Sequence, residues 1–124
     1  MRPSPVAFLA SLCVAVTMAS AAEPLDVGMI QLLATPQKFD GKFIRVDGFL
    51  RLEFEGKALY LHKEDYVNGL YRNSVWVDLL EDKEHMRLNM HYVLIEGVFN
   101  AKNHGHMGLF GGSIEKITRA QTLR

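Results

Sequence analysis

Two segments of the chain repeat one pattern, and each has a glycine inside a run that otherwise favours a β-strand. Residues 43–50 (FIRVDGFL) and 92–99 (YVLIEGVF) both read aromatic, β-branched, variable, β-branched, acidic, glycine, apolar, apolar, at an offset of 49 positions. A glycine within a strand marks a bulge or a sharp bend, and such bends let a small sheet curl until its edges meet. Two copies are too few for a repeat array. The pattern therefore predicts one β-barrel whose first and fourth strands bend at Gly48 and Gly97.

The remaining strands are predicted from apolar side chains that alternate with polar ones, because successive side chains of a strand point to opposite faces. The five expected strands cover residues 43–54, 58–62, 75–79, 91–99 and 113–118. A turn at Gly56 joins the first two of them. The charged segment 81–89 lies between the third and fourth strands and is expected to form one or two helical turns.

One short helix is expected before the first strand. Apolar residues at helical spacing run from Val27 to Ala34, with Asp26 placed to cap the free N–H groups. Pro36 forbids continuation and disfavours the helical conformation for the residue before it. The spacing predicts a helix over about residues 26–35.

Five strands, with a long bent first strand and a bent fourth strand, are the pattern of the OB-fold, a mainly β, five-stranded Greek-key barrel. The segments 41–48 (GKFIRVDG), 58–61 (ALYL) and 92–97 (YVLIEG) resemble the secreted bacterial OB-fold domains often called BOF proteins, and also the barrel of the tRNA-anticodon type. The resemblance covers roughly residues 27–119. It implies an architecture far more than a function, because one fold carries many unrelated functions.

The N-terminal segment has the composition of a secretion signal. Arg2 precedes twenty uncharged residues with an apolar centre, and Ser20 and Ala22 are the small residues that a signal peptidase accepts at the minus-three and minus-one positions. We therefore expect residues 1–22 to be a signal peptide, residues 23–124 to form a single OB-fold-like domain, and the protein to be periplasmic or secreted with no membrane span after cleavage. An uncleaved anchor is the alternative, because twenty uncharged residues nearly span a bilayer.

Composition removes several classes of function. The only cysteine, Cys13, would leave with the signal, so the mature chain would have no disulfide, no thiolate nucleophile and no cysteine-based zinc site. Lys and Arg number 14 against 14 Asp and Glu, which disfavours nucleic-acid binding because that binding neutralises many phosphates. Ser74 and Ser113 are the only serines after residue 22, and neither lies in a nucleophile-elbow motif. We expect no enzyme activity.

The face of the second and third strands is the expected binding surface, because OB-folds use it together with the adjoining loops. Alternation points Leu59, Leu61, Val75, Val77 and Leu79 inward. It sends Tyr60, His62, Trp76 and Asp78 outward, where they would form a ligand platform with Phe110 from the loop after the fourth strand. The alternative is that Tyr60 and Trp76 are covered by the connecting loop or by the N-terminal helix, as large aromatic residues usually are.

The loop over residues 100–113 (NAKNHGHMGLFGGS) suggests a second possibility, a transition-metal site. His104 and His106 flank a glycine and would chelate one ion, with His62 or Met107 as a further ligand. Alternatively, one histidine bonds loop carbonyls while Met107 and Phe110 plug the end of the barrel. The sequence thus predicts an exported, non-catalytic module without cofactor that binds a small molecule or a periplasmic protein, the alternative being a periplasmic metal-binding protein.

Overall fold

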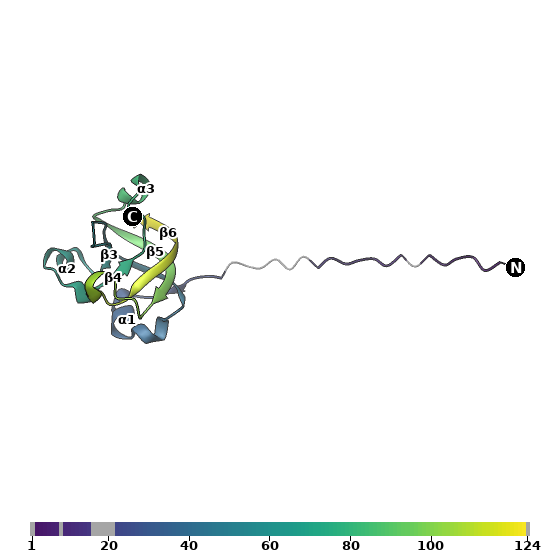
Figure 1. Cartoon of the computed structure of the whole chain (residues 1–124), viewed down its shortest axis with the longest axis horizontal. Helices are drawn as coiled ribbons and strands as arrows, with labels where there is room; N and C mark the ends of the chain where they lie inside the picture. Colours follow the sequence, from purple (N-terminus) through teal and green to yellow (C-terminus); the bar gives the residue numbers. More distant parts are fainter. Residues whose placement is uncertain (1, 8, 16–21, 124) are drawn as a thin grey trace.

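A closed five-stranded barrel forms the centre of the computed structural model, which describes residues 2–7, 9–15 and 22–123 (Figure 1). Its strands are β2 (Phe43–Arg51), β3 (Ala58–Tyr60), β4 (Ser74–Val77), β5 (His91–Asn100) and β6 (Ser113–Thr122). They follow the order β2-β3-β4-β6-β5, and β2 pairs again with β5, from Phe43 opposite Val98 to Leu50 opposite His91. That last pairing closes the ring. The predicted OB-fold-like Greek-key barrel is confirmed.

Both glycines of the repeated pattern lie where another strand passes too close for a side chain. A Cβ on Gly97 would lie 2.7 Å from the carbonyl oxygen of Glu115, and the β5–β6 register shifts between Glu96 and Val98, as expected of a bulge. A Cβ on Gly48 would lie 2.6 Å from the carbonyl oxygen of Tyr60, just before β2 begins to pair with β3 as well as β5. The glycines therefore permit the close strand approach that barrel closure needs.

Short helices connect the strands. They are α1 (Met29–Ala34), α2 (Lys63–Val67) and α3 (Lys83–Met86), with the 3₁₀ turns η1 (Pro36–Phe39), η2 (Tyr71–Asn73) and η3 (His106–Gly108). The predicted helix over 26–35 begins later, after an N-cap at Gly28, because Leu25–Asp26 forms β1 and pairs in parallel with β2. Asp26 is therefore not its cap. α3 fits the predicted turn in 81–89, whereas α2 was not predicted.

The barrel interior holds the apolar side chains that alternation placed there. Leu59, Val75, Val77 and Leu79 are buried, and Leu61 packs partly buried against the same core. α1 and α3 lie at opposite ends of the barrel (Figure 1). Leu32 of α1 is fully buried in the core, and Leu88, just after α3, packs against it. The barrel is thus filled and capped, which leaves its outer surface for binding.

The N-terminal signal prediction concerns residues that the structure describes only in part. Ser20, at the minus-three position of the predicted cleavage site, lies outside the described residues. Across residues 2–7, 9–15 and 22–123, the helices are all too short or too polar to cross a membrane.

Candidate binding groove

A surface groove of about 510 Å³ lies beside β4, between the β2–β3 turn and the loop after β5. Its floor includes Trp76 of β4, and its walls include Phe54 and Glu55 from the turn and Gly105 and His106 from the loop. Lys57, Glu81 and Asn103 complete the lining. We call this set of residues the Trp76 groove. OB-folds bind ligands on the face of their second and third barrel strands, with the adjoining loops. In this protein those strands are β3 and β4, and the groove lies on that face.

Trp76 is held firmly in this groove. It points away from the barrel interior, as predicted, and is half-buried. Phe110 packs against it edge to face, with ring centroids 5.3 Å apart, and the Lys57 ammonium lies 5.7 Å from a Trp76 ring centroid. The same ammonium donates a hydrogen bond to the Leu79 carbonyl oxygen at 3.0 Å. Because strand, loop and lysine all contact the indole, its remaining surface is presented in a fixed orientation.

The loop after β5 approaches the indole through a glycine. Gly105 has a φ of +66°, and a Cβ there would lie 2.8 Å from Trp76 Cε3 and 2.9 Å from Phe110 Cδ2. The Asn103 side chain holds this turn by accepting a hydrogen bond from the Gly105 N–H at 3.0 Å and donating one to Glu115 at 2.9 Å. Only a residue without a side chain fits between these two rings.

One side-chain contact joins the two segments that flank Trp76 in the groove. His106 Nε2 lies 3.3 Å from Glu55 Oε2, which joins the loop after β5 to the β2–β3 turn. Beside this contact, Phe54 leaves 83% of its surface exposed. The stability of the barrel does not require an aromatic ring so open to solvent next to a half-buried tryptophan.

The prediction that Tyr60 shares this exposed face is wrong. Tyr60 points outward from the barrel, but it is only 1% exposed. α2 covers it, with the Tyr66 ring 5.5 Å from the Tyr60 ring, and Phe49 and Phe110 belong to the same buried cluster. The alternative that the connecting segment covers Tyr60 is therefore the correct one. Burial raises the pKa of Tyr60 to about 12.

This raised pKa has a measurable consequence for stability. The folded protein holds the phenol proton more tightly than the unfolded chain, whose tyrosine pKa is about 10. Its contribution to the free energy of unfolding is therefore intact below pH 10 and is lost as the pH rises towards 12, by at most about 2.7 kcal/mol. Urea unfolding of the wild type and Tyr60→Phe at pH 9 and at pH 11.5 measures this loss. The wild type should lose more stability than the variant, and equal losses would contradict the assignment.

His62 and Asp78 lie apart from the groove lining. His62 is not on β3 but immediately before α2, where its backbone N–H donates to Asp65 Oδ2 at 2.9 Å. Asp78 follows β4 and is exposed, with its N–H bonded to the Ile114 carbonyl oxygen at 2.9 Å. β3 is shorter than predicted because the chain turns into α2. Of the predicted platform, Trp76 lines the groove, and Phe110 packs against Trp76 without lining the groove itself.

The two histidines of the loop after β5 contact other protein groups rather than each other. His104 Nδ1 lies 2.8 Å from the Phe110 carbonyl oxygen, and His106 faces Glu55. In residues 2–7, 9–15 and 22–123, no group of three or more His, Cys, Asp or Glu side chains is placed to hold a metal ion. The alternative of a histidine that bonds a loop carbonyl is confirmed at His104. Met107 does not plug the barrel, because it is 78% exposed. Metal binding by His62, His104, His106 and Met107 stays a prediction.

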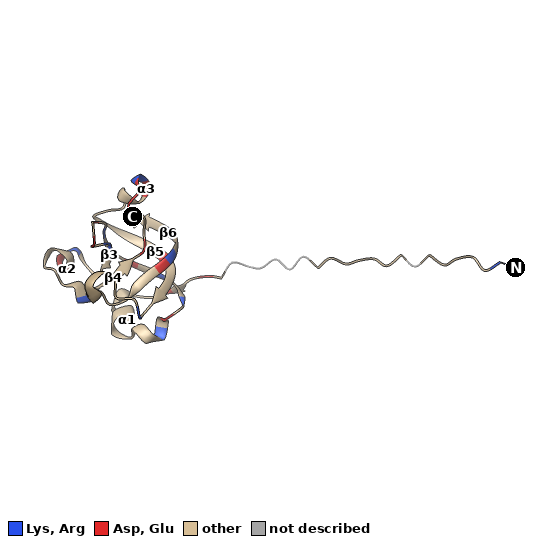
Figure 2. Ribbon diagram, in the orientation of Figure 1, with Lys and Arg blue, Asp and Glu red and all other residues tan. Residues whose placement is uncertain are grey.

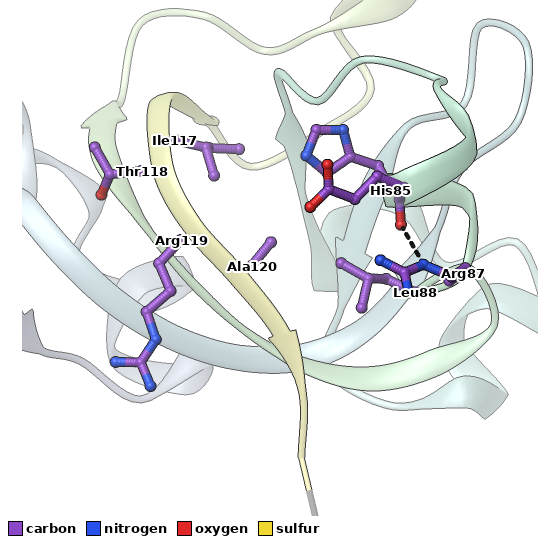
Figure 3. Close-up of a pocket in the computed structure, with 8 residues that line it drawn as sticks. His85, Arg87, Leu88, Ile117, Thr118, Arg119 and Ala120 are labelled. Carbon is purple, nitrogen blue, oxygen red and sulfur yellow. Dashed lines mark hydrogen bonds between the residues drawn. The ribbon is translucent and has the colours of Figure 1, made fainter.

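A second groove, of about 330 Å³, lies between α3 and the C-terminal half of β6 (Figure 3). Its two arginines do not converge on a common point. Arg87 donates to the Glu84 carbonyl oxygen at 3.4 Å, while Arg119 extends away from α3 and donates to Glu96 at 3.1 Å (Figure 3). Because both arginines already have acceptors within the fold, this groove is the weaker candidate.

Charge on the remaining surface is mixed. Basic and acidic residues are scattered over the described strands and helices rather than gathered by sign (Figure 2). Neighbouring opposite charges also neutralise each other, as where Glu96 accepts hydrogen bonds from Arg45 at 2.8 Å and Arg119 at 3.1 Å. No family model matches the chain, and neither a curated protein nor a solved structure matches it.

Proposed function

We propose that the protein is an exported, non-catalytic binding module, and that its ligand, a small molecule or a periplasmic protein, contacts the Trp76 groove. One observation carries the proposal: the only tryptophan of the chain is half-buried in a surface groove and held there by Phe110 and Lys57, next to the exposed ring of Phe54. Aromatic residues placed in this way supply much of the binding energy of protein interfaces and ligand sites.

The chemistry of the groove supports binding rather than group transfer. Its described lining contains no hydroxyl or thiol nucleophile, and its one imidazole contacts Glu55. A site for acyl transfer would need a nucleophile, a base and a group that stabilises developing charge within reach of each other. The groove has instead aromatic surface with a few polar groups around it, which is typical of a binding site.

A thermal melt in the presence of candidate ligands tests this function. Four classes would be compared: neutral oligosaccharides, nucleotides, short peptides and organic cations. A ligand that binds only the folded protein stabilises it by about 2.7 kcal/mol at 100 times its Kd, so at least one class should raise the midpoint further with each tenfold increase in concentration. Trp76→Ala should weaken that binding at least tenfold.

Thr118→Ala is the matched control, because Thr118 is exposed and lies in the groove between α3 and β6. It should leave ligand affinity unchanged. If no class raises the melting midpoint, or if Trp76→Ala binds as tightly as the wild type, the groove is not the binding site.

A further inference from the structure

The Trp76 groove has apolar surface of a particular kind. Its exposed apolar area comes from aromatic rings, Phe54 at the rim and Trp76 on the floor, rather than from aliphatic side chains. A flat ring stacks against a flat apolar ligand face, and the indole also carries an N–H that donates a hydrogen bond. The ligand that suits this surface therefore combines a flat apolar face with polar groups at its edge.

The polar groups around these rings include two carboxylates, which only accept hydrogen bonds. Glu55 and Glu81 line the groove with exposed carboxylates, and each carboxylate accepts several hydrogen bonds. Within residues 22–123, Glu81 makes no salt bridge, and Glu55 uses one oxygen, Oε2, towards His106. Acceptors of this kind suit a ligand with several adjacent hydroxyl groups, because a hydroxyl both donates and accepts.

The charges of the groove disfavour anionic ligands. Lys57 is the only Lys or Arg among its described lining residues, and its ammonium already contacts the Leu79 carbonyl oxygen and the Trp76 ring. The groove therefore has two carboxylates and one ammonium. A phosphate or a uronic acid would therefore meet net repulsion, since anion binding depends on free cationic groups.

We propose that the Trp76 groove binds a neutral oligosaccharide, with the apolar face of a sugar ring against Trp76 and Phe54 and its hydroxyl groups bonded to Glu55 and Glu81. The inference rests on the proposed function and narrows its ligand to one chemical class. A sugar ring has an apolar C–H face and a ring of hydroxyls at its edge, which matches the aromatic surface and the acceptors described above. The volume of the groove, about 510 Å³, is within the range of small-ligand sites.

Intrinsic fluorescence gives a direct test, because Trp76 is the only tryptophan of the chain. The full chain would be titrated with four neutral tetrasaccharides, of β-1,4-glucose, α-1,4-glucose, β-1,4-N-acetylglucosamine and β-1,4-mannose. At least one should give a saturable change in Trp76 emission. The same backbone oxidised to a uronate at C6 should bind at least fivefold more weakly at low salt, and the difference should shrink as salt is added.

Three variants separate the groups involved. Phe54→Ala should weaken binding of the neutral sugar by about threefold to tenfold. Glu81→Gln should bring the affinities for the neutral sugar and its uronate closer together, because it removes one negative charge and keeps the size of the side chain. Arg87→Ala, in the groove between α3 and β6, should change neither affinity.

The outcomes distinguish failure of the oligosaccharide proposal from failure of the proposed binding function. If all four sugars leave Trp76 emission unchanged while a nucleotide or a peptide gives a saturable change, the oligosaccharide proposal is overturned and the binding function stands. Uronate binding as tight as that of the neutral sugar would also overturn it. If every class is silent, both proposals fail.

Discussion

Gly105→Ala is expected to lower the free energy of unfolding by about 2–5 kcal/mol and to open the Trp76 groove. The new Cβ would lie 2.8 Å from Trp76 Cε3 and 2.9 Å from Phe110 Cδ2, closer than real side chains approach each other. Such overlap costs about 1–3 kcal/mol, and the φ of +66° adds about 1–2 kcal/mol for a residue with a side chain. The loop must move away from β4, so Trp76 emission should shift towards that of an exposed indole.

Gly108→Ala is the matched control in the same loop. Gly108 has the same φ of +66°, but nothing lies within 4 Å of the position that a Cβ would take there. This variant should therefore show only the cost of the backbone conformation, about 1–2 kcal/mol. Urea unfolding followed by circular dichroism measures both variants independently of the tryptophan environment. Equal losses at the two positions would mean that contact between the loop and Trp76 contributes nothing to stability.

The barrel was predictable because its determinants are local in sequence. Alternating apolar residues mark the strands, and the glycines of the repeated pattern mark two positions where a backbone carbonyl oxygen of a neighbouring strand leaves no room for a side chain. Strand ends were less predictable. β3 ends at Tyr60 and β6 continues to Thr122, two and four residues from the predicted ends, because pairing with neighbouring strands determines where a strand stops.

The sequence offers burial of the outer face only as an alternative, because alternation gives the direction of a side chain and not what covers it. α2 has five residues, too few for a helical period to stand out. Its one local signal is the spacing of His62 and Asp65, where the carboxylate accepts the backbone N–H three residues earlier at 2.9 Å. Tyr66, which covers Tyr60, lies one residue further on.

Of the residues that line the groove, only Trp76 is predicted from the sequence to belong to the binding surface. Trp76 is predictable because it alternates with buried valines, whereas the sequence places Phe54 and Glu55 only at a strand end and in a turn. The contact between Glu55 and His106 joins positions 51 residues apart, at 3.3 Å. Such a contact depends on how the barrel brings two loops together, and no local pattern encodes it.

Gly97→Ala should be among the most destabilising single changes to the barrel, with an expected loss of about 2–4 kcal/mol. Its Cβ would lie 2.7 Å from the Glu115 carbonyl oxygen and 2.8 Å from Ile114 Cγ2. Overpacking of this kind costs about 1–3 kcal/mol. The cost is at the upper end or above it here, because the nearest atom belongs to the backbone of β6 and cannot rotate away. Urea unfolding followed by circular dichroism would measure the change.

Gly28→Ala provides the comparison for a glycine outside the barrel. Gly28 precedes α1 with a φ of −71°, and the nearest atom to an added Cβ is Gln31 Oε1 at 3.8 Å. Alanine is a poorer N-cap than glycine, so a loss below about 1 kcal/mol is expected. If Gly97→Ala cost no more than this, β6 would be able to move away from β5 without loss. The close approach at the bulge would then be a consequence of barrel closure rather than one of its requirements.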